Sequence, residues 1–282
     1  MTDRSLQTVI PSVAASDGAG VKLRRSIGSR QGAWLDPFLM LDEFFSDDPK
    51  DYLAGFPSHP HRGFETVTYM LDGHMLHEDH LGNRGDLKPG SVQWMTAGRG
   101  VIHSEMPQQA EGRMRGFQLW INLPAKEKMQ PASYRDIAPA EIPSLDLPGG
   151  GRVKVIAGGV DINGTRHSGP IGGLSTDPTY IDVSLPAGAE FDQAIDANYT
   201  AFVYPYEGSP TIGGQSLSKQ SVGVLGHGDR IVIKTGSNEV RFILLAGKPL
   251  GEPIVQYGPF VMNTRQEIEQ AVRDFQSGAL TR

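Results

Sequence analysis

Residues 59–73 have the sequence HPHRGFETVTYMLDG, in which two histidines precede a strand-like run that closes on an Asp-Gly step, a strong hairpin signal. His59 and His61 are two residues apart, so on an extended strand their side chains share one face. A second pair with the same spacing, His103 and Glu105, follows another strand-like segment and a Gly-rich turn. If the two segments lie side by side, the four side chains converge, and the sequence predicts a metal site.

The donor set indicates the kind of ion. Imidazole and carboxylate ligands together suit a first-row divalent transition metal. A site with open coordination positions is typical of chemistry rather than of scaffolding. The chain has no cysteine, which excludes thiolate ligands and disulfides. We therefore expect one mononuclear metal site with the ligands His59, His61, His103 and Glu105, and the spacing does not name the ion.

Glu65 is a second candidate for the carboxylate, because it also lies on the strand face of His61. Four residues of extended strand separate the two Cα atoms by roughly 13 Å, so Glu65 reaches the ion only if Gly63 bends the chain. The corresponding separation of His103 and Glu105 is about 7 Å. Glu105 is therefore the favoured ligand, and Glu65 is expected in the layer of contacts behind the ligands.

The other histidines give weaker signals. His74, His77 and His80 are spaced by three, which alternates faces on a strand, and we assign them to a solvated hairpin. His167 and His227 lie in Gly-rich loops without partners, and we assign them structural roles.

Two alternatives stay open for the residues around the predicted site. The apolar side chains nearby either line a mouth for a flat ring system or fill the core; they are Phe56, Trp94, Met95 and Met106. Gln118 either hydrogen-bonds a ligand or is an ordinary buried amide.

Composition favours an all-β protein of about two domains. The 282 residues include 35 Gly and 20 Pro, which suit many short strands joined by tight turns. The net charge of −6 and the absence of a long basic run argue against nucleic-acid binding. No apolar run approaches the length of a membrane span and the N-terminus does not resemble a signal peptide, so a cytoplasmic protein is expected.

Residues 124–150 lose the strand periodicity and carry several prolines, so we interpret them as the connection between two barrels. The expected domains are 1–140, which binds the metal, and 141–282, which does not. Shifting the chain against itself by 135 residues aligns similar strand-and-turn segments and indicates a weak internal duplication. This shift places Ala194 and Asp196 at the positions of the first histidine pair.

A helix is predicted at the end of the chain. Thr264 and Glu267 fit a capping box, and Ile268, Val272 and Phe275 recur at helical spacing. We expect this helix to pack as part of the second domain.

Two stretches, 59–69 and 93–107, strongly resemble the pirin family of the cupin superfamily. Further matches lie at 35–38, 119–124 and 258–264, so the resemblance spans nearly the whole chain.

The resemblance implies a bicupin of two β-barrels with iron, as Fe(II), held in the N-terminal barrel. The ligands would be the residues that match His59, His61, His103 and Glu105. In ordinary cupins the residue that matches Glu65 is a ligand, and pirins differ from them at this point.

The resemblance also implies two alternative functions. Some family members open the flavonol quercetin with dioxygen, which implies a quercetin 2,3-dioxygenase-like oxidoreductase with a small aromatic substrate. In such an enzyme Glu105 or Glu65 would take the substrate hydroxyl proton. Other members act as regulators through protein partners, which implies an iron- or redox-sensing protein without turnover. A metal-free structural barrel is the third possibility.

Overall fold

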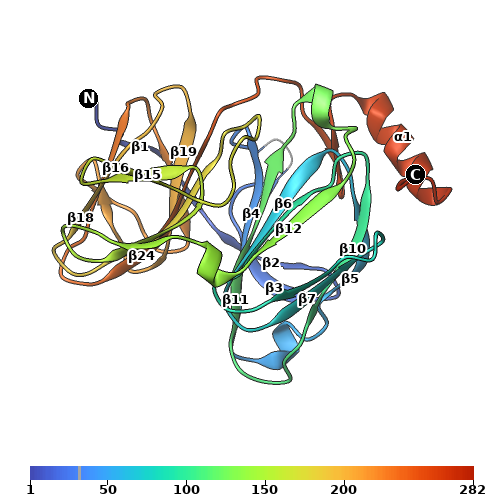
Figure 1. Ribbon diagram of the computed structural model, residues 1–282, viewed down its shortest axis with the longest axis horizontal. Helices are drawn as coiled ribbons and strands as arrows, with labels where there is room; N and C mark the ends of the chain where they lie inside the picture. The colour runs from blue at the N-terminus through green and yellow to red at the C-terminus, as the bar shows by residue number, and fades with distance from the viewer. Residues whose placement is uncertain (31–32) are drawn as a thin grey trace. The chain divides into compact units, whose positions relative to one another are not determined.

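The computed structural model describes residues 1–30 and 33–282, and this part of the chain consists mainly of β-strands (Figure 1). The one α-helix found in it is α1 (Arg265–Gln276). None of the helices in the described part is long and apolar enough to cross a membrane. The predicted all-β class is confirmed.

The chain divides into two compact units. The N-half unit comprises Val13–Pro139 and Leu250–Arg282, and the C-half unit comprises Met1–Ser12 and Ala140–Pro249. The short 3-10 helix η3 (Pro139–Glu141) spans the division.

The N-half unit is built from a seven-stranded and a four-stranded antiparallel sheet that face each other (Figure 1). The larger sheet has the order β12 (Ser133–Ile137), β9 (Val92–Thr96), β6 (Phe64–Asp72), β11 (Met114–Asn122), β4 (Phe38–Ser46), β3 (Val21–Arg25) and β2 (Val13–Asp17). The smaller sheet has the order β5 (Phe56–His61), β10 (Val101–Pro107), β7 (Met75–Asp79) and β8 (Arg84–Leu87). The unit also contains the hairpin β25 (Val255–Tyr257) and β26 (Phe260–Met262), and the 3-10 helices η1 (Pro49–Asp51) and η2 (Ala125–Glu127).

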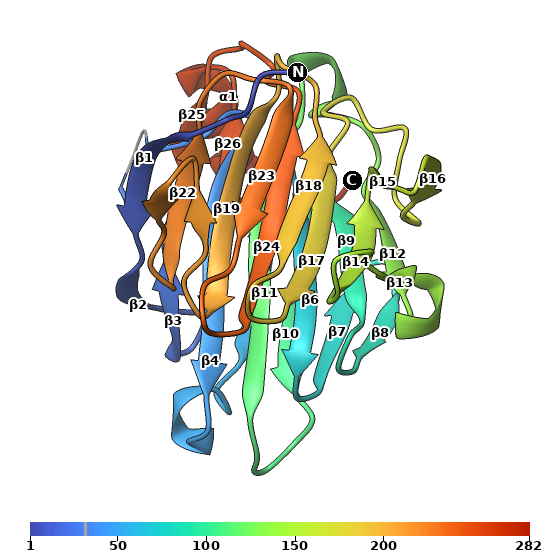
Figure 2. The ribbon, with the colours of Figure 1, turned by 90° about the vertical axis from the view of Figure 1, so that its left-hand side faces the viewer.

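The C-half unit repeats this plan (Figure 2). Its larger sheet has the order β1 (Leu6–Pro11), β22 (Ser221–Leu225), β19 (Thr200–Glu207), β24 (Val240–Gly247), β17 (Thr179–Leu185), β14 (Arg152–Ala157) and β13 (Ser144–Asp146). Its smaller sheet has the order β18 (Glu190–Ala194), β23 (Arg230–Lys234), β20 (Thr211–Ile212) and β21 (Gln215–Ser216), beside the hairpin β15 (Gly159–Ile162) and β16 (Thr165–Ser168).

The interior of the C-half unit is apolar. Its core is a cluster of mainly aliphatic side chains, with Phe191 and Phe242 in contact at a centroid distance of 6.0 Å. On β18, near the position where the sequence shift lays the histidine pair, the buried residues are Phe191 and Gln193. The absence of metal ligands from this barrel stays a prediction.

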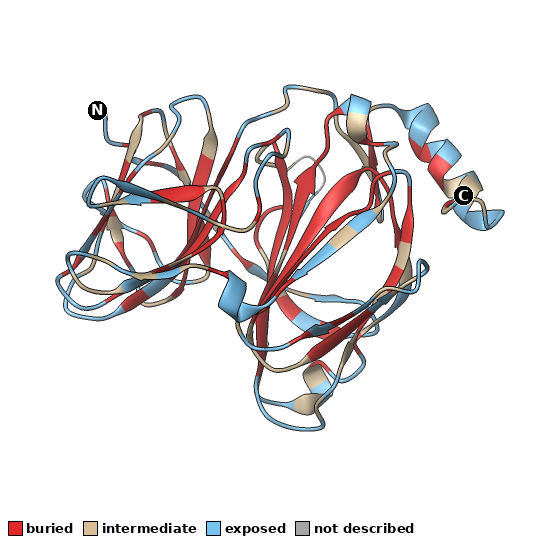
Figure 3. Cartoon of the chain, in the orientation of Figure 1, coloured by how far each residue is buried: buried red, intermediate tan, exposed pale blue. Residues whose placement is uncertain are grey.

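The observed units differ from the expected domains at both chain ends. β1 pairs with β22, and Leu6 joins the C-half core, so the first 12 residues belong to the C-half unit. The capping box of α1 is present, and Ile268 and Ala271 pack beside Phe260 and Met262 of the N-half unit. Figure 3 shows the remainder of α1 largely exposed. The helix therefore completes the first barrel rather than the second.

The predicted Asp-Gly turn forms, but it does not make a hairpin. Gly73 has φ +91°, a left-handed conformation that favours glycine. The strands on either side, β6 and β7, belong to different sheets. The chain crosses the barrel at this turn, and this crossing places β7 next to β10.

Candidate metal centre

Strand register brings the three predicted histidine ligands together. β5 and β10 are antiparallel, with His103 opposite His59. Residues directly opposite in such a pair share a face, and His61 lies two residues from His59 on that face. The Nε2 atoms of His59 and His61 are 3.0 Å apart, and one ring nitrogen from each of the three histidines lies within 4.8 Å of the others. The group is therefore close enough to hold one metal ion.

The protonation of the histidines suits a cation. Burial, followed by the neighbouring histidines, holds the pKa of His61 and of His103 well below the usual value, so both are neutral. His59 Nδ1 is 2.8 Å from the carbonyl oxygen of Pro57, which can only accept, so Nδ1 carries a proton and donates it. In the part of the chain that the structure describes, His103 Nε2 is buried and has no hydrogen-bond partner. Neutral imidazoles with unused lone pairs are the form that binds metals.

Glu105 lies beside the histidines but outside the close group. It follows His103 by two residues on β10, where the register with β5 shifts, and its side chain is buried. Its Oε2 accepts a hydrogen bond of 3.2 Å from Gln118 Nε2. The Thr68 hydroxyl lies 2.8 Å from Glu105 Oε1 and 2.7 Å from Gln118 Oε1, and donates its one proton to either oxygen.

Glu65 does not join the site. Thr68 contacts Glu105, and a residue three positions earlier on the same strand points to the opposite face. Glu65 there accepts a hydrogen bond of 2.9 Å from the Thr96 hydroxyl. Burial raises the pKa of Glu65 to about 7. Gly63 therefore does not turn this carboxyl group toward the histidines.

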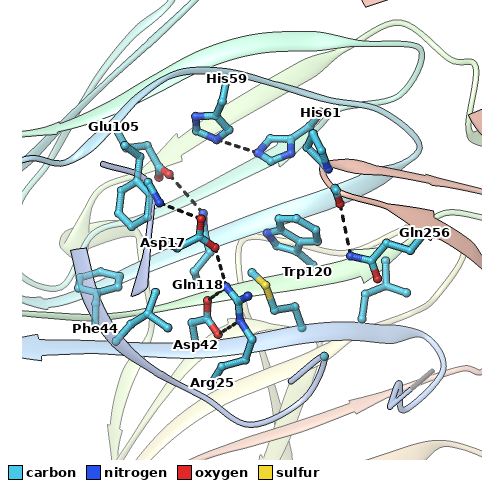
Figure 4. Close-up of a pocket in the computed structure, with 18 of the residues that line it drawn as sticks. Asp17, Arg25, Asp42, Phe44, His59, His61, Glu105, Gln118, Trp120 and Gln256 are labelled. Carbon is cyan, nitrogen blue, oxygen red and sulfur yellow. Dashed lines mark hydrogen bonds and ion pairs between the residues drawn. The ribbon is translucent and has the colours of Figure 1, made fainter. Parts of the chain in front are cut away.

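His59 and His61 open onto a cavity of about 790 Å³ within the N-half unit (Figure 4). One part of its wall is aromatic and contains Phe44, Phe56 and Trp120. Opposite the histidines, Arg25 pairs with Asp42 through two hydrogen bonds of 2.8 and 2.6 Å (Figure 4). The cavity thus combines a candidate metal site, a partly aromatic wall and a polar far end.

Part of this lining was predicted. Phe56 and Gln118 line the cavity, whereas Trp94, Met95 and Met106 are not among its lining residues. Trp94 and Met95 are buried and lie on β9, in the larger sheet. The apolar-mouth prediction therefore holds for Phe56 alone.

Two polar contacts of the N-half unit were not predicted from the sequence, one made by His77 and one between Arg25 and Asp42. His77 was assigned to solvent, and this is wrong because its side chain is fully buried, with Nδ1 3.2 Å from His103 Nδ1. The surface assignment agrees with His80, which is exposed, and with His74, which is half-buried and contacts Asp86. The Arg25–Asp42 pair also gave no signal, because neither residue belongs to a recognisable motif.

The comparisons with known proteins agree with this architecture. The family model Pirin matches residues 20–121, and the model Pirin C-terminal cupin domain matches residues 180–281. A Pseudomonas aeruginosa protein named "Putative quercetin 2,3-dioxygenase" is 55% identical over 269 residues, 94% of each chain. A pirin-like protein of Caulobacter vibrioides is 47% identical over 99% of each chain.

A solved structure gives the same result in three dimensions. The crystal structure of a quercetin 2,3-dioxygenase from Acinetobacter baumannii aligns with a TM-score of 0.88 and 34% identity, over 99% of this chain and 98% of that one. The two facing sheets in each unit, the two matched family models and the close relatives lead to one conclusion. The chain belongs to the pirin family and has its bicupin fold.

Proposed function

We propose that this protein is a metal-dependent dioxygenase of the quercetin 2,3-dioxygenase type. The observation that carries the proposal is a group of three histidines, two of which, His59 and His61, line a large, partly aromatic cavity. A similar protein from A. baumannii bears the name of that activity, and one from P. aeruginosa is named "Putative quercetin 2,3-dioxygenase".

The metal ligands in this proposal are His59, His61, His103 and Glu105. The three histidines lie close enough together to hold one ion, and Glu105 lines the cavity with His59 and His61 and follows His103 on the same strand. This set suits a first-row divalent ion, and iron(II) is the ion that family membership favours. When bound, the ion would supply Lewis acidity and electron transfer between an aromatic substrate and dioxygen.

The remaining cavity residues fit a flavonol, a flat polyphenol with a chelating hydroxyl and carbonyl pair. The aromatic rings of Phe44, Phe56 and Trp120 provide apolar area for a fused ring system. Glu105 is the carboxylate beside the histidines, so it is the group that would take the substrate hydroxyl proton. Gln118 orients it through the hydrogen bond to Oε2.

Oxygen consumption tests the proposal. Protein loaded with iron(II) should consume dioxygen when quercetin is added, and His61→Ala should abolish the reaction. His167→Ala in the C-half unit is the matched control and should leave the rate unchanged. Stoichiometric iron without any flavonol turnover would contradict the enzyme, and would leave regulation through a protein partner as the alternative. Protein that takes up no metal when purified without chelators would contradict the site itself.

A further inference from the structure

His77 is a second buried histidine directly behind the candidate ligands. It lies on β7, opposite Glu105 in the ladder between β7 and β10, so its side chain points to the same face as His103 and Glu105. Its ring is inaccessible to solvent and stacks on Tyr134 with an interplanar angle of 7° and a centroid distance of 5.6 Å. Burial and this stacking therefore restrict the movement of the ring.

The contact between the two rings determines where their protons lie. His103 Nδ1 and His77 Nδ1 are 3.2 Å apart, and only one of them can carry the hydrogen that they share. His103 Nε2 has no hydrogen-bond partner in the described part of the chain, so it is the nitrogen available to an ion. A neutral His103 with a free Nε2 lone pair carries its proton on Nδ1 and donates it to His77. His77 must then be the Nε2–H tautomer, with that N–H buried and without a hydrogen-bond partner among the described residues.

We propose that His77 is a positioning residue, which fixes the ring and tautomer of His103 so that the Nε2 lone pair faces the metal site. This inference rests on the proposed metal centre. Ligand histidines usually donate their second N–H to an outer acceptor, and His59 does so to the Pro57 carbonyl. His77 gives His103 the same support with a neutral acceptor, so the support adds no charge behind the site.

The first test uses wild-type protein loaded with Zn²⁺, a diamagnetic probe. Long-range proton–nitrogen NMR spectra distinguish the two tautomers of each histidine. We expect His103 with its proton on Nδ1 and His77 with its proton on Nε2. If His77 of the wild-type protein carries its proton on Nδ1, the inference is wrong, and no variant is needed to show it.

The second test measures Zn²⁺ affinity by competition with a chromophoric chelator. His77→Leu removes the acceptor and should weaken binding by about 10- to 100-fold. His77→Asn keeps a carbonyl oxygen near the position of Nδ1 and should recover most of the affinity. His227→Leu, a change at an exposed histidine of the C-half unit, should have no effect.

The outcomes separate this inference from the proposed function. If wild-type protein binds no Zn²⁺ at the histidines, the metal centre and the role of His77 both fail. If wild-type protein binds Zn²⁺ and His77→Leu binds it equally well, only the role of His77 fails. Equal losses in the Leu and Asn variants would also overturn it, since a packing role alone would explain them.

Discussion

Two buried carboxyl groups of the N-half unit have different surroundings. Glu105 accepts a hydrogen bond from Gln118 and lines the cavity. Glu65 lies on the opposite face of β6, where it accepts a hydrogen bond from the Thr96 hydroxyl. Burial raises the pKa of Glu65 from 4.5 to about 7. Near neutral pH, Glu65 is therefore partly protonated and its charged form is destabilising.

This difference predicts a pH-dependent stability effect. The folded chain binds the Glu65 proton more tightly than the unfolded chain, so this group lowers stability as the pH rises from 4.5 to about 7. Glu65→Gln should remove that loss and be more stable than wild type at pH 8 by up to about 3 kcal/mol. The two proteins should be nearly equal at pH 4.5. Urea unfolding at both pH values measures the difference, and unchanged metal stoichiometry would agree with a position outside the site.

Gln118 is the amide that orients Glu105, and its removal should affect activity more than folding. In Gln118→Leu, Glu105 loses the donor at Oε2. We expect quercetin-dependent oxygen uptake to fall by about 10- to 100-fold. Gln193→Leu removes a buried amide of the C-half unit and serves as the control for general destabilisation. Equal rates in the wild type and the Gln118 variant would exclude an orienting role for Gln118.

Lys128 joins several elements of the N-half unit from a fully buried position. Its Nζ lies 2.7 Å from the carbonyl oxygen of Gly63, 2.6 Å from Asn122 Oδ1 and 3.0 Å from the carbonyl oxygen of Val261. These oxygens belong to the turn after β5, the end of β11 and β26. Burial lowers the pKa of Lys128 to about 8, so the ammonium group with its three donors persists at neutral pH.

Replacement of Lys128 should therefore be costly. Lys128→Met leaves three oxygens without their shared donor, and we expect a loss of about 3 kcal/mol in the free energy of unfolding. The side chain of Lys126 is 77% exposed, so Lys126→Met is the matched control and should change stability by less than about 0.5 kcal/mol. Denaturant unfolding followed by tryptophan fluorescence measures both. Similar values for the two variants would show that the buried ammonium group contributes little.

The strands around the site show which of its contacts could be predicted from the sequence alone. Spacing identified the faces of β5 and β10, because the period of two depends only on local backbone geometry. Spacing could not identify the contact between His77 and His103, because the turn at Gly73 sends β7 into the other sheet. The ion pair of Arg25 and Asp42 depends on the register of β3 with β4, which no local pattern specifies.

The N-terminal segment of the chain belongs to the C-half unit, and the C-terminal segment belongs to the N-half unit. Residues 1–12 pair into the C-half unit through β1, and residues 250–282 complete the N-half unit with β25, β26 and α1. The C-terminal segment is attached near the site, since Arg62, the residue after His61, donates to Asp274 of α1 at 2.7 Å. The order of the chain and the composition of the folded units therefore differ at both ends.

Metal binding should stabilise the folded N-half unit, including its C-terminal segment, rather than the first half of the sequence. An ion that binds only the folded N-half unit stabilises it by about 2.7 kcal/mol at a concentration 100 times its dissociation constant. Amides that exchange through opening of that unit should then exchange up to about 100-fold more slowly in hydrogen–deuterium exchange.

The two chain ends show whether the protection follows the folded unit or the order of the sequence. With Zn²⁺ as the probe, α1 should gain protection although it follows the C-half strands in sequence. β1 should gain none, although it precedes the histidines. His61→Ala should abolish the protection in α1, since that variant removes a ligand and leaves the contacts of the helix in place. Protection that instead appeared in residues 1–12 and was absent from residues 265–276 would contradict this division of the chain.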